Sequence, residues 1–547
     1  MQLRLRWLLS VISFIGTWAY SISGELNSVQ AAQTVVVTKG SSTESIDIAD
    51  LRKVAETGKV PPDLQRFARQ LSPQQRSQIL SALRAKFDLN VVGVSRLLDT
   101  EMGRTLASAL ASATQRRDNV GVLDVRSGLV LGARKPEGLS LLSFVEAYPR
   151  QTIYIDLDRA FRVVGNFNTS FWQTQAFMAA IAPQLAPRRP QLNLPFDPTK
   201  PGSASVEVLN LKLNDTQRRR EIPVDVYWSE AASSAKPIVV LSHGLGSVRT
   251  DLRYLAEHLA SYGYVVAALE HPGSNETHVR NALKGRNPFL SAQEFLDRPK
   301  DISFVIDELE KLNHSQLKGK LAPDRVLVIG YSLGGSTALS IAGGELQLTE
   351  LKQRCKGNLI SFSLGEGSQC FARELPEDRY QLRDPRVKAA IALNPTTSLL
   401  FGETGLASVA VPTLVEAGSA DKTTPALTEQ IIGFGKIPSP KWLVGFVGGT
   451  HLSVKDPSTT QDQAGQLNTF YTGGEVVGEK AVDIRNYTKA IALAMAAQLT
   501  DEAAKYAIFL TPEYAQLAST DAFPIRLVTE IPPEAQEVVN DFIQNQR

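Results

Sequence analysis

The sequence predicts an α/β protein, with a mostly parallel sheet covered by helices on both faces and a small, mainly helical domain before it. From residue 206 onward, short and almost continuously apolar runs alternate with helix-like segments, as in parallel strands buried on both faces. Before residue 165, apolar residues instead recur at helical spacing. The length of 547 residues also favours two domains, and 43% hydrophobic residues suffice for two cores.

Residues 1–31 are typical of a secretory signal peptide. Arg4 and Arg6 form a short basic region, and the apolar stretch 7–20 is too short to span a bilayer comfortably. Small residues before Ala32 fit a cleavage site. We therefore expect an exported protein, periplasmic or extracellular, and the alternative is an anchor formed by an uncleaved N-terminal helix.

Residues 32–164 predict the helical domain. Ser72-Pro73-Gln74-Gln75 is a capping box with proline at the first helical position, and an amphipathic run to Phe87 follows it. No cluster of histidines, cysteines or carboxylates occurs here, so we interpret the domain as a cover for part of the second domain, with an interaction or lid module as the alternative. Six prolines between residues 182 and 205 predict a linker over 165–205 without regular structure.

Residues 206–547 predict the sheet domain. It opens with an antiparallel hairpin whose basic tip, Arg218-Arg219-Arg220, we expect to be solvated. Buried strands are expected at 237–242, 265–269, 325–329, 387–393, 413–416 and 442–447. An alanine-rich helix over 486–499 and a further helical tail close the domain. An antiparallel hairpin that leads into such a sheet is typical of the α/β-hydrolase fold.

The stretch Gly330-Tyr331-Ser332-Leu333-Gly334 lies between a strand and a helix-like run. G-x-S-x-G in this context predicts a nucleophile elbow, a sharp turn that holds the serine hydroxyl clear of the sheet. Glycine is needed on both sides because a Cβ there would collide with the neighbouring strand or helix. Ser332 is therefore the candidate nucleophile, and it needs a base, an acid that orients the base, and donors for an oxyanion.

His451 is the candidate base, because it lies in a loop of small residues after the last strand. Asp421, beyond the strand 413–416, is the candidate acid, and the order Ser332, Asp421, His451 is that of α/β hydrolases. A carboxylate there would accept the Nδ1 proton of the imidazole. Glu416 and Asp456 are the alternatives for the acid, and a helix cap is the structural alternative for Asp421.

The loop His243-Gly244-Leu245-Gly246 follows the strand 237–242. In this fold one oxyanion donor comes from that loop and the other from the residue after the nucleophile. We therefore assign the N–H groups of Leu245 and Leu333 to the oxyanion. We expect His243 and His271 to shape loops.

Composition and the remaining cysteines and histidines bear on three other kinds of site: a nucleic-acid interface, a disulfide and a zinc site. Lysine and arginine number 58 against 56 aspartates and glutamates, so nothing predicts a nucleic-acid partner. Cys355 and Cys370 could close a loop as a disulfide, whereas a zinc site would need further ligands. We expect His258 and His314 on the surface.

Three segments carry a resemblance to a known family. The runs Ile238–Asn275, Arg298–Ile302 and Gly330–Gly335 resemble the platelet-activating-factor acetylhydrolase and predicted dienelactone hydrolase group of α/β hydrolases. Residues 60–64 and 137–142 are similar to an N-terminal domain of unknown function that occurs on such hydrolases in photosynthetic bacteria.

The resemblance implies esterase activity on short acyl or phospholipid-like esters. It also implies Ser332 as nucleophile, His451 as base, and the N–H groups of Leu245 and Leu333 as oxyanion donors. The acetylhydrolases carry their acid after the strand that here ends at Asn394, which is neutral, so the role passes to Asp421.

We therefore expect an exported serine hydrolase that cleaves small-molecule or lipid carboxylic esters through an acyl-serine intermediate, without a cofactor or metal. An acyltransferase and a non-catalytic scaffold that works through its helical domain are the alternatives. Apolar residues in three insertions, 274–297, 343–384 and 395–410, would form an acyl pocket or a lid that contacts a membrane peripherally, or would simply be packed: Phe289, Leu290, Phe295, Leu399, Leu400 and Phe401. The oligomeric state stays open.

Overall fold

The computed structural model describes residues 32–84, 86–87, 91, 94–95, 98, 107–108, 110–114, 119–166, 174, 177–181, 191–356, 362–460 and 475–546. The signal peptide predicted over residues 1–31 lies outside this part of the chain. Among the helices described, none combines the length and the apolar character needed to cross a membrane.

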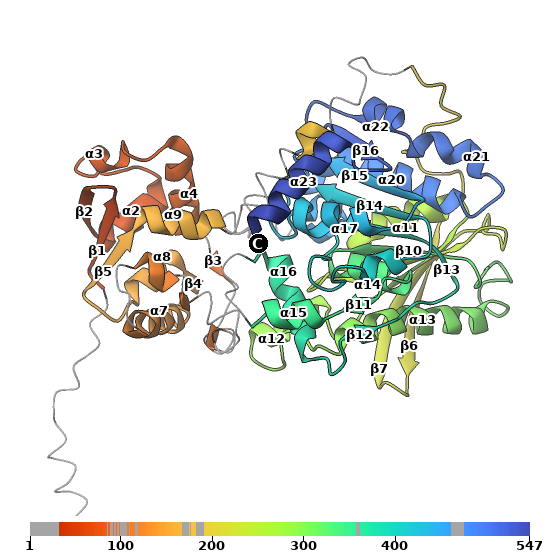
Figure 1. The fold of residues 1–547 in the computed structure, drawn as a ribbon. Coiled ribbons are helices and arrows are strands. Elements are labelled where there is room, and N and C mark those ends of the chain that lie inside the picture. The colour runs from red at the N-terminus through yellow and green to blue at the C-terminus, as the bar shows by residue number, and fades with distance from the viewer. Residues whose placement is uncertain are drawn as a thin grey trace, which may run out of the picture.

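The N-terminal part, red and orange in Figure 1, contains a small sheet that the sequence analysis missed. Its strands lie in the order β2 (Ser42–Asp47), β1 (Thr34–Lys39) and β5 (Thr152–Asp156), with β1 antiparallel to β2 and parallel to β5. β1 has the sequence TVVVTK, and β-branched residues favour strands because they lose rotamer freedom in helices. The prediction of a mainly helical domain is therefore incomplete.

Helices make up most of the other regular structure in this part. They are α2 (Ile48–Thr57), α3 (Gln65–Ala68), α4 (Pro73–Arg84), α7 (Asn119–Gly132), α8 (Leu141–Glu146) and α9 (Leu157–Asn166), beside the short pair β3 (Lys86–Phe87) and β4 (Leu139–Ser140). The predicted capping box begins α4: Ser72 N–H donates to Gln75 Oε1, and Gln75 N–H donates to Ser72 Oγ. Buried side chains of these elements, Val35 and Phe144 among them, form a core of their own.

A nine-stranded sheet organises the rest of the chain. Its order is β16 (Ile525–Val528), β15 (Lys441–Phe446), β14 (Thr413–Gly418), β13 (Val387–Leu393), β10 (Val326–Tyr331), β8 (Ile238–Ser242), β9 (Val265–Leu269), β7 (Arg220–Trp228) and β6 (Glu207–Asp215). The strands from β15 to β9 are parallel, and β16, β7 and β6 join antiparallel at the two edges. The predicted α/β-hydrolase fold is confirmed, but β16 lies where a helical tail was expected.

Helices cover both faces of this sheet (Figure 1). α11 (Arg253–Ser261) and α20 (Val482–Ala497) pack on one face, and α13 (Glu294–Leu312) and α14 (Leu333–Ile341) pack on the other. Neighbouring residues of a strand point to opposite faces, so Val239 and Val240 of β8 belong to different cores. Both faces are buried, which explains why the strands are almost continuously apolar.

Part of the predicted linker belongs to the core of this sheet. Residues 177–180 are helical, and Phe177, Met178 and Ile181 are buried against side chains of the nine-stranded sheet. Leu427 N–H also donates to Thr174 Oγ1 at 3.0 Å. The prediction of an unstructured linker over 165–205 is therefore wrong for this segment, because its apolar side chains precede the prolines. Residues 191–205 do lack helix and strand, as predicted.

The prediction of a solvated tip between β6 and β7 is confirmed for Arg219, which is exposed, and is wrong for Arg218 and Arg220. Arg218 pairs with Asp215 and Asp301, and Arg220 pairs with Glu294 and Asp301. The Arg220 side chain is only 11% exposed. Carboxylates of α13, which the sequence analysis did not connect to this tip, draw both guanidinium groups inward.

His258 is likewise not a surface residue. It lies on α11 and is 4% exposed, with its ring 5.2 Å from that of Tyr262. Burial lowers the pKa of His258 to about 3, so the imidazole is neutral. His314 is exposed, as expected.

A disulfide between Cys355 and Cys370 staples the second insertion. The insertion contains α15 (Thr349–Arg354) and α16 (Leu364–Gln369), and Cys370 follows α16 directly. Gly365 N–H donates to Thr423 O at 2.8 Å. The stapled insertion therefore contacts the loop that carries Asp421.

Candidate active site

Ser332 lies at a sharp turn between β10 and α14. Its φ is +55°, a left-handed conformation that residues other than glycine rarely adopt. A Cβ on Gly330 would lie 1.8 Å from Gly334 O, and a Cβ on Gly334 would lie 2.0 Å from Ser242 O. Only glycine fits on either side of the serine, as the elbow prediction requires.

Ser332, His451 and Asp421 form a continuous hydrogen-bonded chain. Ser332 Oγ lies 3.0 Å from His451 Nε2, and His451 Nδ1 lies 2.7 Å from Asp421 Oδ2. When Nδ1–H donates to the carboxylate, Nε2 is the atom that accepts the hydroxyl proton. The three residues follow β10, β14 and β15, whose carboxyl ends meet at one edge of the parallel sheet.

The environment of His451 strengthens its basicity. Burial by itself would lower the pKa of His451, but the charge and hydrogen bond of Asp421, with help from Glu475, raise that pKa above its ordinary value. Glu475 lies close because its Oε2 accepts from Leu452 N–H at 2.9 Å. The sequence analysis missed Glu475, since nothing in its local pattern connects it to the histidine loop.

Thr424 and Asn394 support the chain and were also missed. Thr424 N–H donates to Asp421 Oδ1 at 2.7 Å, and Thr424 Oγ1 donates to Asp421 Oδ2 at 2.7 Å, which orients the carboxylate. Asn394 Nδ2 donates to His451 O at 3.3 Å, and Asn394 Oδ1 accepts from Gly418 N–H at 3.2 Å. The neutral residue at the end of β13 therefore holds the backbone of the base instead of orienting its ring.

Neither alternative for the acid contacts the histidine ring. Glu416 lies within β14, where Thr488 Oγ1 donates to it, and burial raises the pKa of Glu416 to about 8. Asp456 accepts from Tyr254 N–H at 3.0 Å and from Ser458 N–H at 2.9 Å. Asp421 is the carboxylate that the structure joins to His451.

The loop 243–246 passes directly against the elbow. A Cβ on Gly244 would lie 3.1 Å from Ser332 Cβ, so glycine is what allows this approach. Leu333 is the first residue of α14, where N–H groups lack helical partners. Neither Leu245 N–H nor Leu333 N–H donates to any residue in the described part of the chain. Both donors assigned from the sequence are therefore unpaired in the neighbourhood of the serine.

Arg298 of α13 ties this loop to the nucleophile helix. Its Nη2 donates to His243 O, and its Nε donates to Thr337 Oγ1 of α14 at 3.0 Å. A third bond runs from Nη1 to Ser274 Oγ at 2.6 Å. The side chain is 1% exposed, so one buried guanidinium connects the two segments that carry the predicted oxyanion donors.

A second serine–histidine–aspartate chain lies beside the first but is buried. His271 Nε2 lies 3.0 Å from Ser242 Oγ, and His271 Nδ1 lies 2.9 Å from Asp301 Oδ2, with all three side chains inaccessible. Burial and then the charge of Arg298 lower the pKa of His271 well below its usual value. His271 N–H also donates to His243 Nε2 at 2.9 Å, which agrees with loop-shaping roles for both histidines.

The apolar residues of the insertions are mostly packed. Leu290, Phe295, Leu399, Leu400 and Phe401 are buried in the core of the sheet. Phe289 is half-buried, with its ring 5.9 Å from that of Phe371. Of the two interpretations of these residues, packing is what the structure shows for the five buried side chains.

Two family descriptions match the chain. Residues 31–156 match "Alpha/beta hydrolase of unknown function (DUF1400)", and residues 208–284 match "Platelet-activating factor acetylhydrolase, isoform II". The first match covers the N-terminal part, and the second covers β6 to α12 (Glu276–Leu283), including the loop with Leu245. Both resemblances inferred from the sequence are confirmed.

Curated relatives agree with the second match. The chain is 32% identical over 139 residues to a platelet-activating factor acetylhydrolase of Canis lupus familiaris, which covers 19% of this chain and 31% of the relative. It is 23% identical over 184 residues to that of Bos taurus, which covers 27% of this chain and 40% of the relative. The chain thus matches less than half the length of either protein. It has an α/β-hydrolase fold and resembles the platelet-activating factor acetylhydrolase group.

Proposed function

We propose that this chain is a serine esterase that cleaves carboxylic esters through an acyl-Ser332 intermediate. The observation that carries the proposal is the hydrogen-bonded chain from Ser332 through His451 to Asp421, at 3.0 and 2.7 Å. His451 Nε2 takes the hydroxyl proton as Ser332 Oγ attacks the ester carbonyl. The Leu245 and Leu333 N–H groups donate to the oxyanion that forms.

The second half of the reaction uses the same groups. The tetrahedral intermediate collapses when imidazolium gives its proton to the leaving alkoxide, which departs as the alcohol. Water, deprotonated by His451, then attacks the acyl-serine and releases the carboxylic acid. Asp421 stays ionised throughout and stabilises imidazolium. The residues that act are all part of this chain.

The relatives direct the choice of substrate. Their name states that they hydrolyse an acetyl group from platelet-activating factor. We infer that this chain acts on short-acyl esters, including phospholipid-like ones. The packed insertions support small acyl groups, since five of the six apolar side chains considered for an acyl pocket or a lid are buried in the core.

The test compares the wild-type protein with Ser332→Ala on p-nitrophenyl esters from acetate to decanoate. Wild type should turn over the shortest esters best, and Ser332→Ala should lose turnover completely while keeping its thermal unfolding transition. A fluorophosphonate probe should label Ser332 and leave Ser242 unlabelled, because Ser242 is inaccessible. Retained turnover in Ser332→Ala would contradict the proposal. Transfer of the acyl group to an added alcohol in preference to water would indicate an acyltransferase.

We also propose that the protein is exported and cleaved before Ala32. Ala32 is buried in the N-terminal core, and β1 begins two residues later, so cleavage there would leave the fold intact. Export with the full sequence, followed by mass spectrometry of the N-terminus, should show Ala32 as the first residue. A mature protein that starts at Met1 contradicts cleavage.

A further inference from the structure

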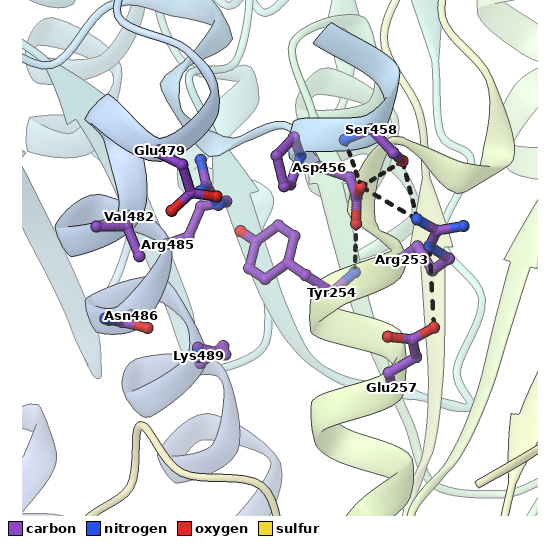
Figure 2. Close-up of a pocket in the computed structure, with 11 residues that line it drawn as sticks. Arg253, Tyr254, Glu257, Asp456, Ser458, Glu479, Val482, Arg485, Asn486 and Lys489 are labelled. Atoms are coloured by element: carbon purple, nitrogen blue, oxygen red, sulfur yellow. Dashed lines mark hydrogen bonds and ion pairs between the residues drawn. The ribbon is translucent and has the colours of Figure 1, made fainter. Parts of the chain in front are cut away.

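A pocket whose lining does not include Ser332 lies between α11, α20 and the turn that begins α18 (Pro457–Thr460) (Figure 2). Its volume is about 340 Å³. The lining side chains are nearly all polar: Arg253, Tyr254, Glu257, Asp456, Ser458, Glu479, Arg485, Asn486 and Lys489. None of them belongs to the serine–histidine–aspartate chain or to the oxyanion loop.

On the α11 side of the pocket, the charges are already paired. Arg253 lies 3.5 Å from Asp456 Oδ1 and 3.8 Å from Glu257 Oε1, and its Nη2 donates to Ser458 Oγ (Figure 2). Asp456 also accepts from Tyr254 N–H. Two carboxylates thus face one guanidinium, so this wall offers no unpaired positive charge to an anion.

On the α20 side, two cations have no ion-pair partner among the residues that the structure describes. Arg485 is 5% exposed, and its Nη1 is buried without a hydrogen-bond partner. Neither Arg485 nor Lys489 forms an ion pair with any residue that the structure describes. A buried guanidinium without a counter-ion is costly, because the charge loses hydration and gains nothing in return.

The two cations also repel each other. They lie four residues apart on α20, which places them on the same side of the helix. Burial, and next the charges of Arg485 and Lys200, lower the pKa of Lys489, with Asp197 offsetting part of the effect. An anion bound between the two side chains would reduce their repulsion and supply the counter-charge that both lack.

We propose that this pocket binds the carboxylate or phosphate group of a small anionic ligand, held by Arg485 and Lys489. A guanidinium presents parallel N–H donors that match the oxygen atoms of either group, and an ammonium adds a second positive charge. The amide of Asn486, on the same turn of α20, offers a further donor. Glu479 is exposed in the same wall and is the group that competes with the anion for these cations.

The pocket shares no residue with the serine–histidine–aspartate chain, but it is connected along the chain to the turn that carries His451. The turn η6 (His451–Val454) ends two residues before Asp456, whose N–H donates to Asp251 O at 2.6 Å. Lys455, between them, pairs with Asp251 at 3.0 Å. Binding is therefore measured directly, by calorimetry, so that the result does not depend on catalytic activity.

The experiment titrates inorganic phosphate and, separately, acetate into the full chain at constant ionic strength, with chloride as the reference anion. Wild type should bind at least one of the two saturably, and the stronger one identifies the chemistry of the natural ligand. Arg485→Met should weaken binding by about tenfold to a hundredfold, because it removes a charge-assisted pair of hydrogen bonds. Lys489→Met should weaken it as well, and it keeps the test valid if Arg485→Met fails to fold.

Two further variants distinguish binding in this pocket from non-specific attraction of the anion to positive charge. Glu479→Gln should bind at least as tightly as wild type, because it removes the competing carboxylate. Lys480→Met removes the same charge as Arg485→Met from an exposed position outside the pocket and should leave binding unchanged. The proposal is overturned if wild type binds neither anion saturably, or if Lys480→Met weakens binding as much as Arg485→Met does.

Discussion

Arg298 donates a hydrogen bond to the main-chain carbonyl of His243, two residues before the proposed oxyanion donor Leu245. The same guanidinium bonds to Thr337 on the helix that begins with Leu333. The separation between the two proposed oxyanion donors therefore depends on one side chain from a third element. Arg298 is a positioning residue in this arrangement, since it contacts the loop and the helix but not the serine.

We expect Arg298→Lys to lower kcat for p-nitrophenyl acetate by about 10- to 100-fold while KM changes little. Lysine keeps the charge but cannot bridge both segments, and a displacement of about 1 Å in catalytic geometry costs that much. A trifluoromethyl ketone, which forms an oxyanion on Ser332, should lose affinity in parallel with kcat. Lys300→Met, at an exposed position on α13, is the control; loss of kcat without weaker ketone binding would contradict the role.

The pH profile tests the pairing of His451 with Asp421. The pKa of His451 is raised, and the imidazole must be neutral to accept the Ser332 proton, so kcat/KM should fall as pH drops, with an apparent pKa above about 6.5. Asp421→Asn removes the charge that outweighs burial, so the acid limb should move to lower pH and kcat should fall by about 10³- to 10⁴-fold. An unshifted acid limb in this variant would assign the limb to another group.

Glu416 should make stability depend on pH. Its pKa is about 8 when folded and 4.5 ordinarily, so between these values the folded chain holds a proton that the unfolded chain has lost. The free energy of unfolding should therefore fall by about 1.4 kcal/mol per pH unit over this range through Glu416 alone. Glu416→Gln removes this contribution. Its free energy of unfolding in urea, measured relative to that of wild type, should therefore rise from pH 5 to about pH 8. A constant difference between the two proteins would refute the raised pKa.

The disulfide should matter to stability more than to chemistry. Replacing both Cys355 and Cys370 by serine frees a loop with a sequence separation of 15, and it should lower the free energy of unfolding by about 3 kcal/mol. Activity should fall only if α16 moves away from Thr423, which lies two residues after Asp421. Reduced wild type should match the double variant in urea; unchanged stability on reduction would show that the bond contributes nothing.

Phe177 tests whether the segment before the prolines is structural. It is fully buried in the sheet core, so Phe177→Ala should cost about 3–5 kcal/mol of unfolding free energy. Val208→Ala, at a 47% exposed position on the edge strand β6, is the control and should change stability by less than about 0.5 kcal/mol. Equal effects of the two variants on stability would show that the segment around Phe177 is a linker and not part of the core.

The positions of residues could be predicted from the sequence where strand order alone determines them. Ser332, Asp421 and His451 each follow a strand of one parallel sheet, so their meeting at its carboxyl edge could be predicted from the order of apolar runs. The glycines around Ser332 could be predicted for the same reason, because a strand–turn–helix elbow has no room for a Cβ.

Contacts between elements far apart in the chain could not be predicted. Arg298 and His243 are 55 residues apart, and no local pattern connects Glu475 with Leu452. The buried position of Phe177 was not predicted because prolines follow it closely. The strand β1 was not predicted because apolar residues in the rest of its segment recur at helical spacing. Thr424 could have been found, because an aspartate in a turn often accepts a hydrogen bond from a backbone N–H two or three residues on, as Asp421 does from Thr424.

The buried chain from Ser242 through His271 to Asp301 gives this protein an internal comparison for its own chemistry. The two chains have nearly the same interatomic distances, yet only Ser332 is open to a reagent from solution. We therefore expect Ser242 to stay unreactive, although its hydroxyl is bonded to a paired imidazole. In the proposed reaction, access for the substrate and room for the departing alcohol distinguish Ser332 from Ser242, which is buried in the sheet.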